Sequence, residues 1–142
     1  MKKPVIRLLD TDTFSHLFAQ HPKVVKKFNA VPSSEVVGTT VITRIETLRG
    51  RFDYALKADN AEDLIKAHKL LTQTDEWLKI FHIAPFNQFA ADHFIQLNKR
   101  IRIRRADLLI ACICLAHGAI LVTRNVKDFR VVPNLRIENW LD

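Results

Sequence analysis

Short hydrophobic runs separated by polar turns follow one another along this chain. Residues 5–9 form an apolar, partly β-branched run that ends at the polar residues 10–13, which is typical of a buried strand followed by a helix cap. The remaining runs of this short, apolar kind predict strands at residues 36–39, 80–83, 119–123 and, shortest of all, 136–138.

Between these runs, apolar residues recur at intervals of three and four, which predicts helices. We expect Thr40 to cap the helix that passes through Glu46, and Gly118 to end the last long helix as its C-cap. Four positions after residue 61 are expected to face the core: Leu64, Ala67, Leu70 and Leu71. The predicted helices lie at residues 14–18, 23–30, 41–58, 61 onward, 86–99 and 108–116.

Strands that alternate with helices favour an α/β fold in which helices cover both faces of a short parallel sheet. No repeat, low-complexity tract or linker interrupts the 142 residues, so we expect residues 1–142 to form a single domain. In such sheets, ligands bind beyond the carboxyl ends of the strands. We therefore expect the functional side chains to lie at this edge of the sheet.

Four acids stand where an apolar run passes from core to surface: Asp10, Glu46, Asp107 and Asp128. Carboxylates brought together repel one another, and a divalent cation is the usual remedy. Hard cations such as Mg²⁺ or Mn²⁺ prefer these oxygen ligands. Two-metal sites hold their ions roughly 3.5–4 Å apart and can stabilise both the attacking and the leaving oxygen. We therefore predict a metal site that cleaves phosphodiester bonds.

Each of these acids also fits an ordinary role when it is considered alone. Asp10 could cap a helix, Asp107 could interact with a helix dipole, Glu46 could pair with a neighbouring arginine, and Asp128 could cap a turn. Their joint placement at one end of a sheet favours the metal site. Three further polar residues could orient a water molecule or a phosphate oxygen, or could simply make turn hydrogen bonds: Thr11, Thr123 and Asn125.

The charge of the chain favours a polyanionic partner. Lys and Arg outnumber Asp and Glu by 22 to 15, giving a net charge of +7. Residues 99–105 alone carry five basic side chains next to Asp107, which could bind a nucleic-acid backbone or could form a solvated loop. The arginines that we expect to contact this backbone, which the family resemblance described below implies is RNA, are Arg100, Arg102, Arg104 and Arg105.

Other features bound the cellular setting. Cys112 and Cys114 are two residues apart in an apolar helical stretch, where a disulfide between them is not expected, and free thiols suit a reducing cytoplasm. The run at residues 5–9 is short and interrupted by Arg7, so it predicts neither a signal peptide nor a membrane span. We expect a cytoplasmic protein with no membrane association.

Taken in order, these motifs resemble those of the PIN-domain ribonucleases of the small bacterial VapC toxin type. The resemblance spans nearly the whole chain, in the stretches Leu8 to Asp12, Thr40 to Gly50, Pro85 to Ala91, Ala106 to Ala111, Leu121 to Phe129 and Ile137 to Trp140. It implies a PIN-like three-layer sandwich and Mg²⁺- or Mn²⁺-dependent endonucleolytic cleavage of RNA. It also implies a cognate antitoxin whose tail occupies the active-site groove, and a homodimer.

The family's acidic residues map onto Asp10, Glu46, Asp107 and Asp128, and its site threonine and asparagine onto Thr123 and Asn125. The chain departs from the family at Asp12, where Asn is frequent. It also departs at residues 99–105, where many members carry fewer charges and a glycine.

Two other functions fit parts of the sequence. Asp10 and Asp12, two residues apart after an apolar strand, resemble the nucleophile and acid of haloacid dehalogenase-like phosphatases, with Asp10 as the nucleophile. That family also needs paired acids after a later strand, where this chain has only Asp128. Alternatively, the acids are structural caps and the chain is a non-catalytic module that binds RNA or an antitoxin.

Overall fold

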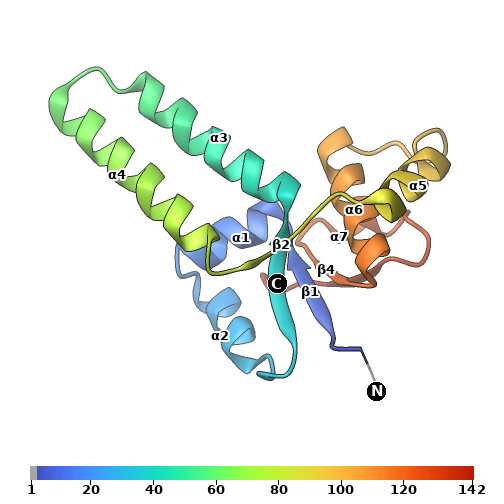
Figure 1. The fold of residues 1–142 in the computed structure, drawn as a ribbon. Helices are drawn as coiled ribbons and strands as arrows, with labels where there is room; N and C mark the ends of the chain where they lie inside the picture. Colours follow the sequence, from blue (N-terminus) through green and yellow to red (C-terminus); the bar gives the residue numbers. More distant parts are fainter. Residues whose placement is uncertain (1–2) are drawn as a thin grey trace.

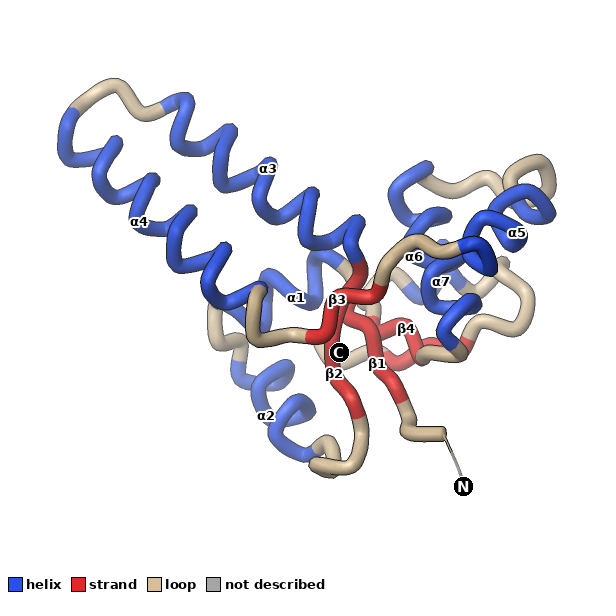
Figure 2. Tube along the Cα trace, viewed as in Figure 1, coloured by secondary structure: helices blue, strands red, loops and turns tan. Residues whose placement is uncertain are grey.

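The computed structural model of the chain describes residues 3–142. Within them, five parallel strands form one sheet in the order β3-β2-β1-β4-β5. Figure 2 shows the strands at the centre of the molecule, with helices on either side. The predicted α/β sandwich with a short parallel sheet is confirmed. The strands are β1 (Ile6–Leu9), β2 (Val36–Thr40), β3 (His82–Ala84), β4 (Ile120–Val122) and β5 (Arg136–Glu138).

The helices divide between the two faces of the sheet, as Figure 1 shows. The first group comprises α1 (Thr11–Phe18), α2 (Pro22–Ala30), α3 (Val41–Lys57) and α4 (Ala61–Leu78). The second group comprises α5 (Gln88–Leu97), α6 (Arg105–His117) and the single turn α7 (Val126–Phe129). The long α3–α4 hairpin extends well beyond the sheet (Figure 1).

Apolar side chains of the central strands point alternately to the two faces of the sheet, so each face has its own hydrophobic core. Leu8 of β1 and Leu121 of β4 join the cluster formed with α5 and α6, while the next residues, Leu9 and Val122, join the cluster formed with α1 and α2. Successive strand residues point to opposite faces, so a strand buried on both sides is apolar throughout. This explains why β4 contains only Ile120, Leu121 and Val122.

The helix ends follow the predicted capping chemistry. The Thr40 side chain accepts a hydrogen bond from the Thr43 backbone N–H at the start of α3. Gly118 ends α6 in the left-handed conformation, with φ of 61°, which glycine adopts without a Cβ penalty. Both predicted caps are confirmed. Asn87 caps α5 in the same way as Thr40, so that helix begins at Gln88 rather than at residue 86.

Two predictions about the α4 region are wrong. Leu64 does not face the core and is 38% exposed, because the hairpin that carries it projects past the sheet. The strand predicted at residues 80–83 begins at His82 instead, and Ile80 is 76% exposed in the turn that follows α4. Only residues 82–84 pair with β2.

Cys112 and Cys114 are free and buried in α6, as expected. Burial raises the pKa of the Cys112 thiol to about 11. Within residues 3–142, no helix combines the length and the apolar character that crossing a bilayer requires.

Candidate active site at the carboxyl edge of the sheet

The candidate site lies where the strand order reverses. From the central strand β1 the chain adds β2 and then β3 on one side, while β4 and β5 lie on the other side. Such a switch point leaves a crevice outside the carboxyl ends of the strands, where ligands bind in open α/β sheets. Asp10 and Thr123 follow β1 and β4 directly at this point.

Asp10 is fixed by hydrogen bonds from both of its neighbours in space. Its Oδ1 accepts from the Thr13 backbone N–H at 2.9 Å, which caps α1, and its Oδ2 accepts from Thr123 Oγ1 at 2.6 Å. Its backbone N–H also donates to the Val122 carbonyl at 3.0 Å. The helix-cap role and the site role considered for Asp10 are therefore compatible, because each uses a different oxygen.

Asp10 is only 7% exposed, and none of the ion pairs within residues 3–142 involves it. Burial raises the pKa of this carboxyl above its usual value, although the hydrogen bonds from Thr123 and Thr13 act in the opposite direction. A buried carboxylate without a cation is costly. The Asp10 carboxylate is therefore suited to binding a cation.

Glu46 reaches the site from α3. Its Oε1 accepts from Thr11 Oγ1 at 2.7 Å, and Thr11 Oγ1 also lies 3.1 Å from Thr43 Oγ1. Thr43 precedes Glu46 by three residues, so both side chains lie on the same face of the helix. Thr11 thus holds the first turn of α1 against α3 and orients the Glu46 carboxylate.

Arg104 joins Glu46 to Asp107. Its Nη1 donates to Glu46 Oε2 at 2.9 Å and its Nη2 donates to Asp107 Oδ1 at 3.0 Å. The hydrogen bonds to Asp107 and to Glu46 raise the pKa of the Arg104 guanidinium. Glu46 therefore pairs with Arg104 and not with an arginine close to it in α3. Asp107 lies in the first turn of α6 but does not cap that helix.

A cavity of about 400 Å³ opens beside Asp10, Arg104 and Asp107, whereas Glu46 does not line it. Asp10 and Asp107 contribute carboxylates to its wall, and Arg104 contributes its guanidinium. The full lining is Asp10, Thr11, Asp12, Arg104, Asp107, Arg124, Asn125 and Phe129.

Asp128 lies apart from the other three acids. It does not line this cavity but a neighbouring hollow, which it shares with Arg102, Arg104 and Arg105. Asn125 connects the two spaces, because it lines the first cavity while its Nδ2 donates to Asp128 Oδ2 at 2.8 Å.

Oxygen donors of the kind that hard cations prefer thus face the cavity, so the donor chemistry fits Mg²⁺ or Mn²⁺. The expected gathering of four carboxylates is nevertheless incomplete. Within residues 3–142, no three His, Cys, Asp or Glu side chains form a group that could hold an ion as they stand. Of the four predicted acids, only Asp10 and Asp107 line the cavity, because Glu46 is held by Thr11 and Arg104 outside its wall and Asp128 faces the neighbouring hollow.

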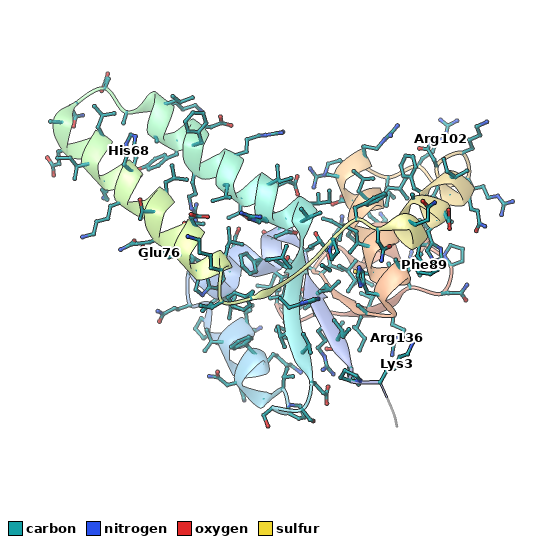
Figure 3. The ribbon with its side chains drawn as sticks, viewed as in Figure 1. Lys3, His68, Glu76, Phe89, Arg102 and Arg136 are labelled. Carbon is teal, nitrogen blue, oxygen red and sulfur yellow. The ribbon has the colours of Figure 1, made fainter. Side chains whose placement is uncertain are left out.

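The basic segment before α6 lies beside the cavity. Arg100 and Arg102 are exposed, and Figure 3 shows Arg102 at the outer edge of this end of the molecule, far from His68 on the outer part of the α3–α4 hairpin. Arg105 lies over the Phe94 ring, 5.0 Å from its centroid. Arg104 is the member of this set that contacts the acids.

The sequence did not predict the place of three residues in the wall of the cavity. Arg104 was expected at the RNA backbone rather than between two acids, although its spacing of three residues from Asp107 is a recognised ion-pair spacing in helices. Arg124 and Phe129 also line the cavity, and no sequence pattern pointed to either.

A family model described as PIN domain matches residues 7–135. The chain belongs to the PIN-domain family. Among relatives of this PIN domain, Ribonuclease VapC1 of Haemophilus influenzae is 30% identical over 143 residues, covering 96% of this chain and 98% of that protein. Ribonuclease VapC2 of Rickettsia felis is 27% identical over 142 residues, with the same coverage.

Solved structures agree with this membership. VapBC-1 from nontypeable Haemophilus influenzae superimposes with a TM-score of 0.72 at 26% identity, covering 97% of this PIN domain and all of that chain. VapBC2 from Rickettsia felis, bound to a DNA fragment from the promoter, gives a TM-score of 0.74 at 23% identity over 96% and 99% of the two chains. The resemblance to VapC-type PIN domains is confirmed.

Proposed function

We propose that this PIN domain is the toxin of a toxin–antitoxin pair and acts as a Mg²⁺- or Mn²⁺-dependent endoribonuclease. The observation that carries the proposal is the buried Asp10, which has no cation partner in the described chain and faces one cavity together with Asp107. The relatives named ribonucleases support the reaction class. PIN-domain membership favours this reaction over the phosphatase alternative.

Asp10, Glu46 and Asp107 would hold the cation, with Asp128 as the fourth acid, approached through Asn125. When bound, Mg²⁺ or Mn²⁺ would supply positive charge that favours ionisation of an attacking water and offsets charge on the leaving oxygen. The chain's own contribution is orientation. Thr123 fixes one oxygen of Asp10, and Thr11 fixes one oxygen of Glu46. Such supporting hydrogen bonds set the direction and basicity of carboxylate ligands.

The basic segment would bind the substrate backbone. Arg100, Arg102 and Arg105 are exposed, and Arg102 and Arg105 line the hollow next to the cavity. Phosphate contacts of this kind position RNA without selecting its sequence. The net charge of +7 favours association with RNA more generally. We propose that the protein acts in the cytoplasm, where its substrate and a reducing environment are found.

We also propose a cognate antitoxin and a homodimer. VapBC complexes among the similar structures support the antitoxin. The α3–α4 hairpin adds exposed apolar side chains that are unusual on a free surface, namely Ile45, Phe52, Tyr54, Leu56 and Ile65. Light scattering of the purified chain, alone and co-expressed with the product of a neighbouring small reading frame, tests both partners.

Cleavage of total cellular RNA tests the activity. The wild-type protein should cut RNA with Mg²⁺ or Mn²⁺ and stop when EDTA is added, and mapped ends should identify the sites. Asp10→Asn and Asp107→Asn should each abolish cleavage while circular dichroism shows an unchanged fold. Asp53→Asn, an exposed acid on α3 remote from the cavity, is the matched control and should cleave normally.

Full activity in either site variant would overturn the proposed catalytic centre. Metal-independent RNA binding without cleavage at high protein concentration would instead support the non-catalytic module.

A further inference from the structure

Arg104 spans two elements that are distant in sequence. It precedes α6 and pairs with Asp107 in that helix, and it also pairs with Glu46, 58 residues earlier in α3. Its Nε–H adds a longer contact of 3.4 Å to Asp107 Oδ2. Together with the Thr11 bond to Glu46 Oε1, these contacts engage all four oxygens of the two carboxylates.

We propose that Arg104 is an internal counter-cation that competes with the divalent metal for Glu46 and Asp107. The inference rests on the metal-dependent function proposed above and concerns what controls access to that metal. In the metal-free protein, the guanidinium lies between two carboxylates that would otherwise repel each other, and it offsets part of their negative charge. Binding of a metal to the same oxygens then requires Arg104 to leave.

Arg104 and a metal ion exclude each other for two reasons. The guanidinium stays charged at any pH a protein tolerates, so it cannot relieve the repulsion from a nearby cation by losing a proton. Its fork also points N–H groups at the oxygen lone pairs that a metal would need. A direct exchange of cations is therefore the simplest way to load the site.

The surroundings of Arg104 allow it to leave. Its side chain is 58% exposed, whereas those of Glu46 and Asp107 are 24% and 15% exposed. It lines both the cavity with Asp10 and the neighbouring hollow with Arg102 and Arg105. A released guanidinium can turn into that second space without unfolding any element.

Arg104 would therefore weaken metal binding, and removing it should strengthen metal binding. We expect Arg104→Gln to bind Mn²⁺ about fivefold to thirtyfold more tightly than the wild type, as the loss of two partly exposed ion pairs would allow. Arg102→Gln, which removes the same charge from the same segment, corrects for the general loss of positive potential. Isothermal titration with Mn²⁺ alone, at fixed ionic strength and without RNA, measures all three affinities.

A second measurement uses the unaltered protein. The ¹⁵N–¹H signal of the Arg104 Nε–H, assigned by its absence from Arg104→Gln, should move during a Mg²⁺ titration with the midpoint of metal binding. The Arg102 signal should not follow it. Because the signal can also be assigned in the wild type through the bonds that link Nε to the Arg104 backbone, this readout remains available if Arg104→Gln folds poorly.

Equal or weaker Mn²⁺ affinity in Arg104→Gln relative to Arg102→Gln would overturn the competition, as would an Arg104 signal that ignores Mg²⁺. Other results would contradict the proposed function and can be distinguished from failure of the competition. If Mn²⁺ binds neither the wild type nor any variant, metal dependence itself is wrong. If Asp10→Asn weakens Mn²⁺ binding while the two arginine variants agree, only the role of Arg104 is lost.

Discussion

At the scale of single residues, Thr123 shows how a buried hydroxyl supports the site. Its Oγ1 donates to Asp10 Oδ2 at 2.6 Å and accepts from the Asn125 backbone N–H at 3.0 Å. The side chain is fully buried, so no solvent can replace the hydrogen bond to Asp10. One hydroxyl therefore sets both the direction of the central acid and the path of the loop after β4.

Replacing Thr123 by Val keeps the shape of the side chain but removes this donor. Asp10 would lose a hydrogen bond that favours its charged form, so its pKa should rise further. We expect metal affinity or cleavage to fall by about 10–100-fold, as for other residues that support metal ligands. Mn²⁺ titration and RNA cleavage assays measure the two effects.

Thr47→Val provides the matched control. Thr47 is also buried, but its Oγ1 has no hydrogen-bond partner in the described structure. Removing that hydroxyl should leave cleavage unchanged and should not reduce the free energy of unfolding. If both variants behave alike, the hydrogen bond from Thr123 to Asp10 does not support the site.

At the scale of elements, the β2–β3 pair depends on a close approach of two backbones. Gly38 of β2 is paired with His82 of β3, and a Cβ on Gly38 would overlap the His82 carbonyl oxygen. Glycine within a strand commonly marks such an approach. The edge strand β3 can therefore join the sheet only because position 38 lacks a side chain.

We expect Gly38→Ala to lower the free energy of unfolding by about 1–3 kcal/mol, since the backbone of β3 has to shift. Gly50→Ala lies in the interior of α3, where the added Cβ would meet no atom within 4 Å apart from the local backbone of its own helix. This change should instead raise the free energy of unfolding by about 0.5–1 kcal/mol. Urea unfolding of the two variants measures the difference. A neutral Gly38→Ala would show that β3 is not held closely against β2.

At the scale of the whole molecule, the arginine-rich segment before α6 and the tip of the α3–α4 hairpin lie at different ends. The arginine-rich segment before α6 flanks the cavity, while the α3–α4 hairpin extends away from it and carries exposed apolar side chains. Figure 3 shows the same separation, with His68 on the hairpin and Arg102 on the opposite side. If RNA binds at Arg100 and Arg102 as proposed, the hairpin tip would remain available to the proposed protein partner.

If Arg100 and Arg102 contact phosphates, their joint replacement by Gln should lower RNA affinity and make it less dependent on salt. Each lost contact with a single strand reduces the slope of log affinity against log salt by roughly 0.7. The reduction in RNA affinity should be largest at low salt. Lys66→Gln with Lys69→Gln, which removes two charges from the outer part of α4, should leave this slope unchanged.

Fluorescence anisotropy with a labelled, non-cleavable oligonucleotide at several salt concentrations gives both slopes. Equal slopes for the two double variants would mean that only the overall charge attracts RNA.

The sequence determined the parallel α/β sandwich, the N-cap at Thr40, the C-cap at Gly118 and the positions of Asp10 and Thr123 after their strands. These features are local, because apolar periodicity and capping chemistry operate over a few residues. The order of the strands was not predicted, because it depends on pairing between segments that are distant along the chain.

Only the tertiary structure decided how the acids are paired. The contact from Arg104 to Glu46 joins residues 58 positions apart, and Asp128 turns to a neighbouring hollow although it follows the same strand as Thr123. The exposure of Leu64 was likewise set by how far the hairpin projects. Such features depend on distances between packed elements, which the spacing of residues along one segment does not encode.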